Sequence, residues 1–228
     1  MKILQTLILL FITFLPAGAA ADGPPVPQSA EVHLSKHHEK SRNATVKVKS
    51  QFGHGTGTYV KVGKSYGILT AAHVVDDGSN HYIIEAGLHQ SIATLIWKDE
   101  DSDVAFLVTE KIDKLSSLKI ASYPDIRVGE QIIYSGFPSS HEMLTFSCQI
   151  ANPSYNGMIA IQGWAWFGSS GSGFINKKGR VFAVLSAVNV ESFYGHPQVL
   201  ETLVYGAPIR EHMITQIQEQ LNIWKENQ

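Results

Sequence analysis

A histidine, an aspartate and a serine of this chain stand in sequence surroundings that suit acyl-transfer chemistry. His73 ends the run Leu69-Thr70-Ala71-Ala72-His73, Asp103 begins Asp103-Val104-Ala105-Phe106-Leu107, and Ser170 lies within Gly168-Ser169-Ser170-Gly171-Ser172-Gly173. A serine hydroxyl is a weak nucleophile until a neighbouring imidazole removes its proton, and a buried carboxylate fixes the tautomer of that imidazole. These three residues therefore predict a nucleophilic serine, with His73 as general base and Asp103 as the group that orients it.

The glycines around Ser170 suit a second requirement of this chemistry. A tetrahedral intermediate carries a developing negative charge, which backbone N–H groups can stabilise. A glycine two residues before the nucleophile lets the chain turn without a clash at Cβ. Gly168 occupies that position. We therefore expect the N–H groups of Gly168 and Ser170 to form an oxyanion hole.

These three motifs resemble those of the trypsin-like (chymotrypsin-fold) serine peptidase superfamily, over roughly residues 45 to 205. The resemblance rests on Thr-Ala-Ala-His, on Asp-Val-Ala-Phe and on Gly-Ser-Ser-Gly. It implies an all-β protein of two six-stranded antiparallel β-barrels with the active site in the cleft between them. The Gly-x-Ser-Gly-Ser-Gly run followed by Phe174-Ile175-Asn176 is similar to bacterial enzymes of the glutamyl endopeptidase type.

Two choices within the motifs stay open on spacing alone. Asp99 and Asp101 lie in the same acidic segment as Asp103, but only Asp103 directly precedes the apolar strand. Three serines crowd the glycine-rich turn, and Ser170 alone has a glycine two residues before it and another directly after it. We take Asp103 and Ser170 as the candidates and keep Asp101 as the alternative acid.

The resemblance also indicates where a substrate side chain would bind. In this superfamily the base of the specificity pocket lies about six residues before the nucleophile, and one wall is the strand after the nucleophile turn. The matching positions are Trp164, Ala165, Ser186, Ala187 and Val188. None is acidic, which disfavours a preference for Lys or Arg. Glutamyl endopeptidases bind an acidic side chain through a histidine in the wall strand, but residues 185–188 contain none, and His196 and His212 are the nearest alternatives. We therefore expect a small or apolar residue before the scissile bond.

The N-terminus has the layout of a secretory signal peptide over residues 1–21, with Lys2, an apolar run and a small-residue end at 17–21. The apolar run is short for a membrane span, so we expect no membrane association after cleavage and a secreted or periplasmic protein. A retained anchor is the competing interpretation. Residues 22–42 are expected to form a flexible lead-in.

Composition excludes several other classes. The formal net charge is −2 with no basic cluster, which argues against a nucleic-acid partner. The single cysteine, Cys148, rules out an internal disulfide and is expected to be a buried apolar residue. His33, His37 and His38 could bind a metal if their segment were helical, but no third ligand cluster accompanies them. We expect neither metal nor cofactor.

Strand signals divide the remainder into an N-terminal barrel over 43–115 and a C-terminal barrel over 116–207. Beyond Pro208, apolar residues recur at helical spacing, which predicts a helix over 208–226 docked on the second barrel. They are Ile209, Met213, Ile217, Leu221 and Trp224.

Together these features predict a monomeric, exported serine endopeptidase acting on proteins or peptides. One alternative is a peptidase-like fold without turnover that binds peptides or proteins. An α/β-hydrolase esterase would require the order Ser, acid, His, which this chain does not have.

Overall fold

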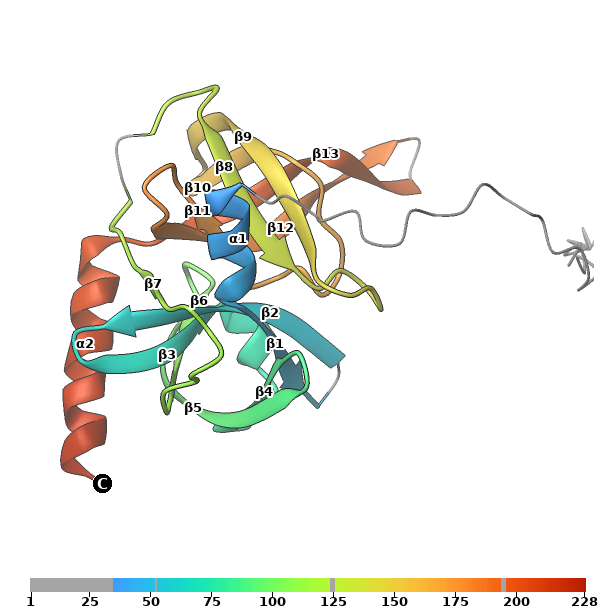
Figure 1. The fold of residues 1–228 in the computed structure, drawn as a ribbon. Coiled ribbons are helices and arrows are strands. Elements are labelled where there is room, and N and C mark those ends of the chain that lie inside the picture. Colours follow the sequence, from blue (N-terminus) through green and yellow to red (C-terminus); the bar gives the residue numbers. More distant parts are fainter. Residues whose placement is uncertain (1–34, 52, 124–125, 194–195) are drawn as a thin grey trace, which may run out of the picture. The chain divides into compact units, whose positions relative to one another are not determined.

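The first six strands form a closed antiparallel barrel. A computed structural model of the chain describes residues 35–228 apart from residues 52, 124–125 and 194–195. The first-barrel strands are β1 (Thr45–Ser50), β2 (Gly53–Val62), β3 (Ser65–Thr70), β4 (His81–Ala86), β5 (His89–Asp99) and β6 (Val104–Thr109). They follow the order β1-β4-β5-β6-β3-β2, and pairing of β1 with β2 closes the ring (Figure 1). β6 is buried along its whole length, as its apolar run predicts.

A second barrel follows, built from another six strands. These are β8 (Gln131–Gly136), β9 (Leu144–Tyr155), β10 (Met158–Gln162), β11 (Gly173–Ile175), β12 (Val181–Phe193) and β13 (His196–Pro208). The ring runs β10-β13-β12-β11-β8-β9 and has its own apolar core, which includes Tyr134, Phe174 and Phe182. The predicted pair of six-stranded antiparallel barrels with a C-terminal helix is therefore confirmed.

The connection between the barrels stays attached to both of them. The short strand β7 (Leu118–Lys119) pairs in parallel with β2 of the first barrel. Directly after it, Ile120 bridges to Val181, and Ala121 N–H donates to the Val181 carbonyl at 2.8 Å. Leu118 and Lys119 thus belong to the sheet of the first barrel, whereas we expected the second barrel to begin at 116.

The segment just before the first barrel contains a helix where an unstructured lead-in was expected. Helix α1 spans Lys36–Asn43, and Ser35 caps its start with its side chain. It lies against β8, β9 and β11 of the second barrel (Figure 1). Arg42 donates to the Met143 carbonyl at 3.1 Å and to Thr145 Oγ1 at 3.0 Å. The lead-in prediction is therefore wrong for residues 36–42, because contacts distant in sequence stabilise this polar helix.

The C-terminal helix forms, but it docks on a different barrel from the one expected. Helix α2 spans Glu211–Glu226. Ile217 and Leu221 are buried within the core of the first barrel, and Trp97 Nε1 of β5 donates to Gln216 Oε1 at 3.3 Å. The spacing of the apolar residues gave the buried face correctly. It contained no information about which barrel that face would cover.

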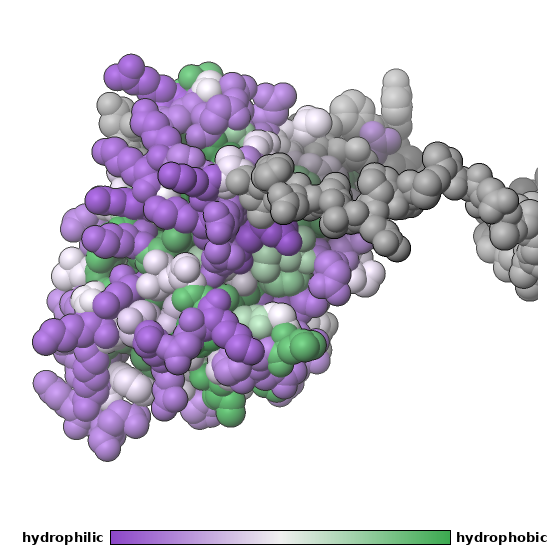
Figure 2. All heavy atoms as spheres, in the orientation of Figure 1, coloured by the Kyte–Doolittle hydropathy of each residue, from purple (hydrophilic) through white to green (hydrophobic). Residues whose placement is uncertain are grey.

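The surface is mostly hydrophilic in the view of Figure 2, and hydrophobic residues show more over the first barrel than over the second. Exposed apolar side chains include Ile83 and Ile92, which pair directly across β4 and β5, and Leu88 in the turn between these strands. Among the described residues, no helix is long and apolar enough to cross a membrane. The predicted signal peptide (1–21) and residues 22–34 of the lead-in lie outside the described residues.

Candidate active site

The two barrels meet where His73 and Asp103 form a hydrogen-bonded pair. His73 lies in a 3-10 helix, η1 (Ala72–Val75), directly after β3, and Asp103 ends the turn between β5 and β6. His73 Nδ1 lies 2.9 Å from Oδ2 and 3.0 Å from Oδ1 of Asp103. The backbone N–H of His73 also donates to Oδ1 at 3.0 Å. The carboxylate therefore holds both the ring and the main chain of the histidine.

The Asp103 carboxyl is partly buried and stays ionised. Its backbone has φ +53°, in the left-handed region that aspartate tolerates better than most residues, and its N–H donates to the Glu100 carbonyl at 3.2 Å. Burial is the largest influence on its pKa and acts to raise it. Hydrogen bonds from the His73 ring, the Ser186 hydroxyl and the His73 backbone together outweigh burial, so the net pKa lies below its usual value.

Asp99 and Asp101, the open alternatives for the acid, lie elsewhere. Asp99 Oδ1 accepts from the Ser102 N–H at 3.3 Å within the turn. Both residues line a surface groove together with Trp97 of β5 and His212 of α2. The structure places Asp103, and neither alternative, on the His73 ring.

Only one of the three serines in the glycine-rich turn has an accessible side chain. Ser169 and Ser172 are fully buried, and the Ser172 hydroxyl donates to the Ser169 carbonyl at 2.7 Å. Ser170 is half-buried. In the described part of the chain its hydroxyl makes no hydrogen bond, either to His73 or to another residue. Catalytic hydrogen bonds are commonly long in unliganded sites and tighten when substrate binds.

The two glycines that flank the candidate nucleophile are required by the backbone. Gly168 has φ +92° and Gly171 has φ +91°. A Cβ atom on Gly168 would lie 2.4 Å from the Phe137 carbonyl oxygen, and one on Gly171 would lie 2.0 Å from the Thr56 carbonyl oxygen. Both the left-handed conformation and the close backbone approach therefore exclude a side chain.

Strand β2 joins the histidine segment to the serine turn. The Thr56 N–H donates to the Ser170 carbonyl at 2.8 Å. A Cβ atom on the neighbouring Gly55 would lie 2.6 Å from the Val74 side chain and 3.0 Å from the Ser170 carbonyl oxygen. Val74 directly follows His73, so this strand brings the segments of both residues together although they are almost a hundred positions apart.

The expected oxyanion donors have no internal partner. Among the described residues, neither the Gly168 N–H nor the Ser170 N–H donates to a protein acceptor. The Phe167 carbonyl accepts from the Ser139 N–H at 2.6 Å. Because a trans peptide group is planar, this bond directs the adjoining Gly168 N–H away from Ser139. Ser139 itself has φ +54°, an uncommon conformation for a residue other than glycine.

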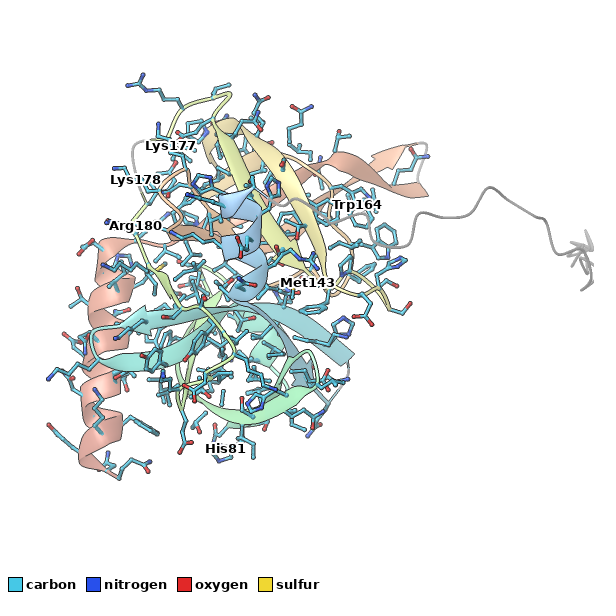
Figure 3. The ribbon with its side chains drawn as sticks, viewed as in Figure 1. His81, Met143, Trp164, Lys177, Lys178 and Arg180 are labelled. Atoms are coloured by element: carbon cyan, nitrogen blue, oxygen red, sulfur yellow. The ribbon has the colours of Figure 1, made fainter. Side chains whose placement is uncertain are left out.

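The five positions predicted to bind the substrate side chain fall into different surroundings. Trp164 lines a groove with Cys148 and Thr202, and its ring lies 5.3 Å from that of Phe146. Figure 3 shows Trp164 on the second barrel, on the opposite side of that view from the turn of Lys177, Lys178 and Arg180. Ala165 is buried in the second core.

The three strand positions lie on β12, beside the serine turn. The Gly171 N–H donates to the Leu185 carbonyl, and the Leu185 N–H donates to the Ser172 carbonyl, both at 2.8 Å. Ala187 is exposed and Val188 is half-buried. Ser186 instead donates its hydroxyl to Asp103 Oδ2. The Ser186 side chain therefore contacts Asp103, whereas the sequence predicted that it lines the pocket for the substrate side chain.

The histidines that suggested a metal serve as contacts between α1 and the second barrel. His37 Nε2 lies 2.7 Å from the Lys177 carbonyl oxygen, and His38 Nε2 lies 2.9 Å from Ser147 Oγ. His33 lies outside the described residues. Among those described, no group of three or more His, Cys, Asp or Glu side chains is placed to hold a metal ion. Cys148 is buried on β9, as expected.

Sequence reasoning missed the polar residues of β2. The segment His54-Gly55-Thr56-Gly57-Thr58 alternates small and hydrogen-bonding residues. In the structure its polar side chains reach the second barrel: His54 Nε2 lies 2.9 Å from the Phe137 carbonyl oxygen, and Thr58 Oγ1 accepts from the Gly173 N–H at 2.9 Å. The alternation was a usable signal for a strand whose two faces have different partners.

Comparison with known proteins agrees with this geometry. The family described as a trypsin-like peptidase domain matches residues 55–184, more than half of the chain. The chain therefore belongs to this family of trypsin-like peptidases.

Its relatives include bacterial envelope proteases. A probable periplasmic serine protease, Do/HhoA-like, of Haemophilus influenzae is 26% identical over 145 residues, which cover 60% of this chain and 31% of that protein. The periplasmic pH-dependent serine endoprotease DegQ of Escherichia coli gives the same identity and coverage. The chain thus spans about a third of the length of these relatives.

Solved structures show the same fold at lower identity. An inactive form of Rv3671c from M. tuberculosis aligns with a TM-score of 0.62 and 20% identity, over 85% of this chain and 92% of that one. The serine endoprotease from Yersinia pestis aligns with a TM-score of 0.63 and 21% identity, over 84% of this chain and 68% of that one. These likenesses concern the fold.

Proposed function

We propose that this protein is a serine endopeptidase that cleaves proteins or peptides through an acyl-enzyme intermediate. The observation that carries the proposal is the hydrogen-bonded His73–Asp103 pair within a trypsin-like peptidase domain, with the half-buried Ser170 on a turn that packs with the segment after His73 against β2. Hydrolysis by this arrangement uses only side chains, backbone N–H groups and water. No cofactor is needed.

Each residue has a defined part in the reaction. Ser170 Oγ attacks the scissile carbonyl while His73 Nε2 accepts its proton, and His73 then returns the proton to the leaving amine. Asp103 holds Nδ1 and stabilises the imidazolium cation. The unpartnered N–H groups of Gly168 and Ser170 stabilise the oxyanion. Water then repeats the sequence on the acyl-enzyme and releases the acid product.

The unpaired edge of β12 offers a place where a peptide substrate could bind as an added strand. Beyond Leu185, no described strand pairs with the edge of β12 that faces the serine turn, while β13 pairs with the other edge. An extended peptide can add to such an edge through main-chain hydrogen bonds. Ala187 and Val188 would then contact substrate side chains, which favours small or apolar residues before the scissile bond.

The glutamyl preference suggested by motif style has weaker support. His212, one of the alternatives for an acid-binding histidine, lies on α2 in the groove beside Trp97 of the first barrel. The β12 segment 185–188 contains no histidine. A library of peptides that differ in the residue before the cut would separate acidic from apolar preference.

The names of the relatives suggest a location. Both envelope relatives are described as periplasmic, and the first 21 residues of this chain have a signal-peptide layout. We place the mature protein outside the cytoplasm, as a monomer that acts on proteins there. Fractionation of the source cells with an antibody to residues 211–226 would test the location.

The first experiment is labelling of the purified protein with a fluorophosphonate probe, which reacts with activated serines. Labelling that maps to Ser170 by mass spectrometry and is absent from Ser170→Ala supports the proposed function. Ser154→Ala is the control, because that serine is exposed and lies outside the turn. It should keep the labelling.

One observation favours a second candidate. The Ser170 hydroxyl has no hydrogen bond to His73 in this structure, as would hold for a peptidase-like fold that binds peptides without cleaving them. A folded wild-type protein that remains unlabelled, yet binds peptides from the library, would establish that alternative.

A further inference from the structure

Thr56 of β2 is a buried residue of the first barrel whose N–H, carbonyl and hydroxyl groups each make a hydrogen bond to a segment that carries the candidate active site. Its exposure is 0%. Its N–H donates to the Ser170 carbonyl at 2.8 Å, and its carbonyl accepts from Thr70 Oγ1 at 2.7 Å. Thr70 precedes His73 by three residues. One residue thus connects the strand that leads to the general base with the turn that carries the nucleophile.

The Thr56 hydroxyl makes the contacts that concern the oxyanion donors. It donates to the Gly168 carbonyl at 2.7 Å and accepts from the Phe137 N–H at 3.1 Å. Gly168 contributes one expected oxyanion N–H, and its flexible left-handed backbone has no side chain to hold it in place. The orientation of the turn therefore depends on the hydrogen bonds that its carbonyl groups make.

Two bonds from Thr56 fix this turn from both sides of the nucleophile. The hydroxyl holds the carbonyl of Gly168, two residues before Ser170 along the chain, and the N–H holds the carbonyl of Ser170 itself. Because both carbonyls bind the same buried residue, the two hydrogen bonds restrain the backbone of Gly168 and Ser170 relative to each other. Small displacements of reacting groups cost large factors in rate.

We propose that Thr56 is a positioning residue: its hydroxyl holds the Gly168 carbonyl and its N–H holds the Ser170 carbonyl, and together they keep the turn in the arrangement in which the Gly168 and Ser170 N–H groups stabilise the oxyanion. This inference rests on the proposed peptidase function. Thr56 contacts no reacting atom, and it acts through the carbonyl of Gly168. Its loss should lower the rate of the chemical step and leave the initial binding of a substrate or probe nearly unchanged.

Thr58 provides a matched control on the same strand. It is also buried, and its hydroxyl accepts from the Gly173 N–H at 2.9 Å, three residues after the candidate nucleophile. Valine at either position keeps the branched shape and removes one buried hydroxyl. Thr56→Val breaks two hydrogen bonds and Thr58→Val breaks one, so Thr56→Val should lose more stability, and only Thr56→Val releases Gly168.

The experiment compares fluorophosphonate labelling kinetics of wild type, Thr56→Val, Thr56→Ser and Thr58→Val at a temperature where urea titrations show all four to be folded. Rates over a range of probe concentrations separate initial binding from the phosphonylation step. We expect Thr56→Val to slow the phosphonylation step by about tenfold or more, since removing an oxyanion donor outright costs about 10²–10³. Thr56→Ser, which keeps the hydroxyl, and Thr58→Val should stay within about threefold of wild type.

Two results would overturn the proposal. One is a Thr56→Val protein that labels as fast as wild type; the other is equal slowing in Thr56→Val and Thr58→Val, which would mean that any lost contact between the barrels has the same effect. A folded wild type that is not labelled at all would refute the peptidase function itself, and the role of Thr56 with it. That outcome is distinct because it does not depend on the variants.

If Thr56→Val does not fold, Thr56→Ala and Thr56→Ser form a second comparison. Both lack the γ-methyl group, and only serine can donate to the Gly168 carbonyl. A phosphonylation rate in the alanine variant about tenfold below that of the serine variant supports the proposal. Equal rates in the two variants contradict it.

Discussion

The hydroxyl of Ser186, on β12 of the second barrel, donates a hydrogen bond to Oδ2 of Asp103, which directly precedes β6 of the first barrel. The same oxygen lies 2.9 Å from His73 Nδ1. The acid is thus shared between the barrels: one supplies the carboxylate and the histidine, and the other supplies a hydrogen-bond donor that holds the carboxylate in place. Any relative movement of the barrels would disturb the His73 ring through this contact.

Replacement of Ser186 by alanine should therefore lower the turnover rate more than it raises KM. A hydrogen bond to a charged group contributes about 1.5–3 kcal/mol, and about 1.4 kcal/mol corresponds to tenfold in rate. Since His73 still holds the carboxylate, we expect a loss of about tenfold or less in kcat. Steady-state kinetics with a cleaved peptide would measure it. The exposed Ser154 provides a control, and an unchanged kcat in Ser186→Ala would show that the contact has no catalytic role.

Asp103→Asn should reduce turnover by about 10³–10⁴, because an amide can no longer enforce the correct histidine tautomer. The fold should remain intact, since the amide fits the same space. Circular dichroism and probe labelling on one preparation would separate these effects. Near wild-type turnover in this variant would remove Asp103 from the mechanism.

The lowered pKa of Asp103 also predicts how stability depends on pH. A carboxyl whose pKa is lower in the folded than in the unfolded protein stabilises the fold above its unfolded value of about 3.9, and this contribution is lost as the pH falls through the folded value. Asp103→Asn lacks the contribution. As the pH falls from about 5 to about 3, the unfolding free energy of the wild type should therefore decrease relative to that of the variant. Urea titrations at both pH values would test this, and a constant difference would contradict it.

Ser139→Pro should weaken catalysis by removing a backbone donor. The Ser139 N–H holds the Phe167 carbonyl at 2.6 Å, which orients the neighbouring Gly168 N–H. Proline lacks this N–H and cannot adopt φ +54°. Ser139→Gly keeps the donor and suits the left-handed conformation, so it should be at least as active as wild type. Labelling rates of both variants would test the assignment, and a fully active proline variant would refute it.

The sequence specified local features of this protein better than contacts between distant segments. The apolar run of β6 and the spacing of Ile217 and Leu221 on α2 predicted elements that the structure contains. The choice of barrel for α2 and the ordering of α1 depend on surfaces that assemble only in the folded chain. Arg42 illustrates the second case, because its partners Met143 and Thr145 lie about a hundred positions away.

The same distinction between local and distant contacts applies to the candidate site. His73, Asp103 and Ser170, the proposed catalytic residues, were predicted from short motifs, because the proposed chemistry demands particular residues in particular local conformations. Ser186 and Thr56 contact partners in the other barrel, and nothing adjacent to them in the sequence indicates those partners. Their roles required coordinates.

Cys148 should be inert in the folded protein. It lies on β9 in the core of the second barrel, and burial raises the pKa of its thiol to about 12. The thiolate is the reactive form, so at about pH 8, near the ordinary thiol pKa of about 8.5, the buried side chain stays protonated and shielded. Ellman's reagent should give no signal with native protein at that pH. In urea the single thiol should react fully, because exposure restores an ordinary pKa. Rapid reaction of the native protein would contradict this prediction. It would show that the second barrel opens at β9 on the timescale of the assay, so that the core of this barrel is less stable than the packing of Tyr134 against Phe174 indicates.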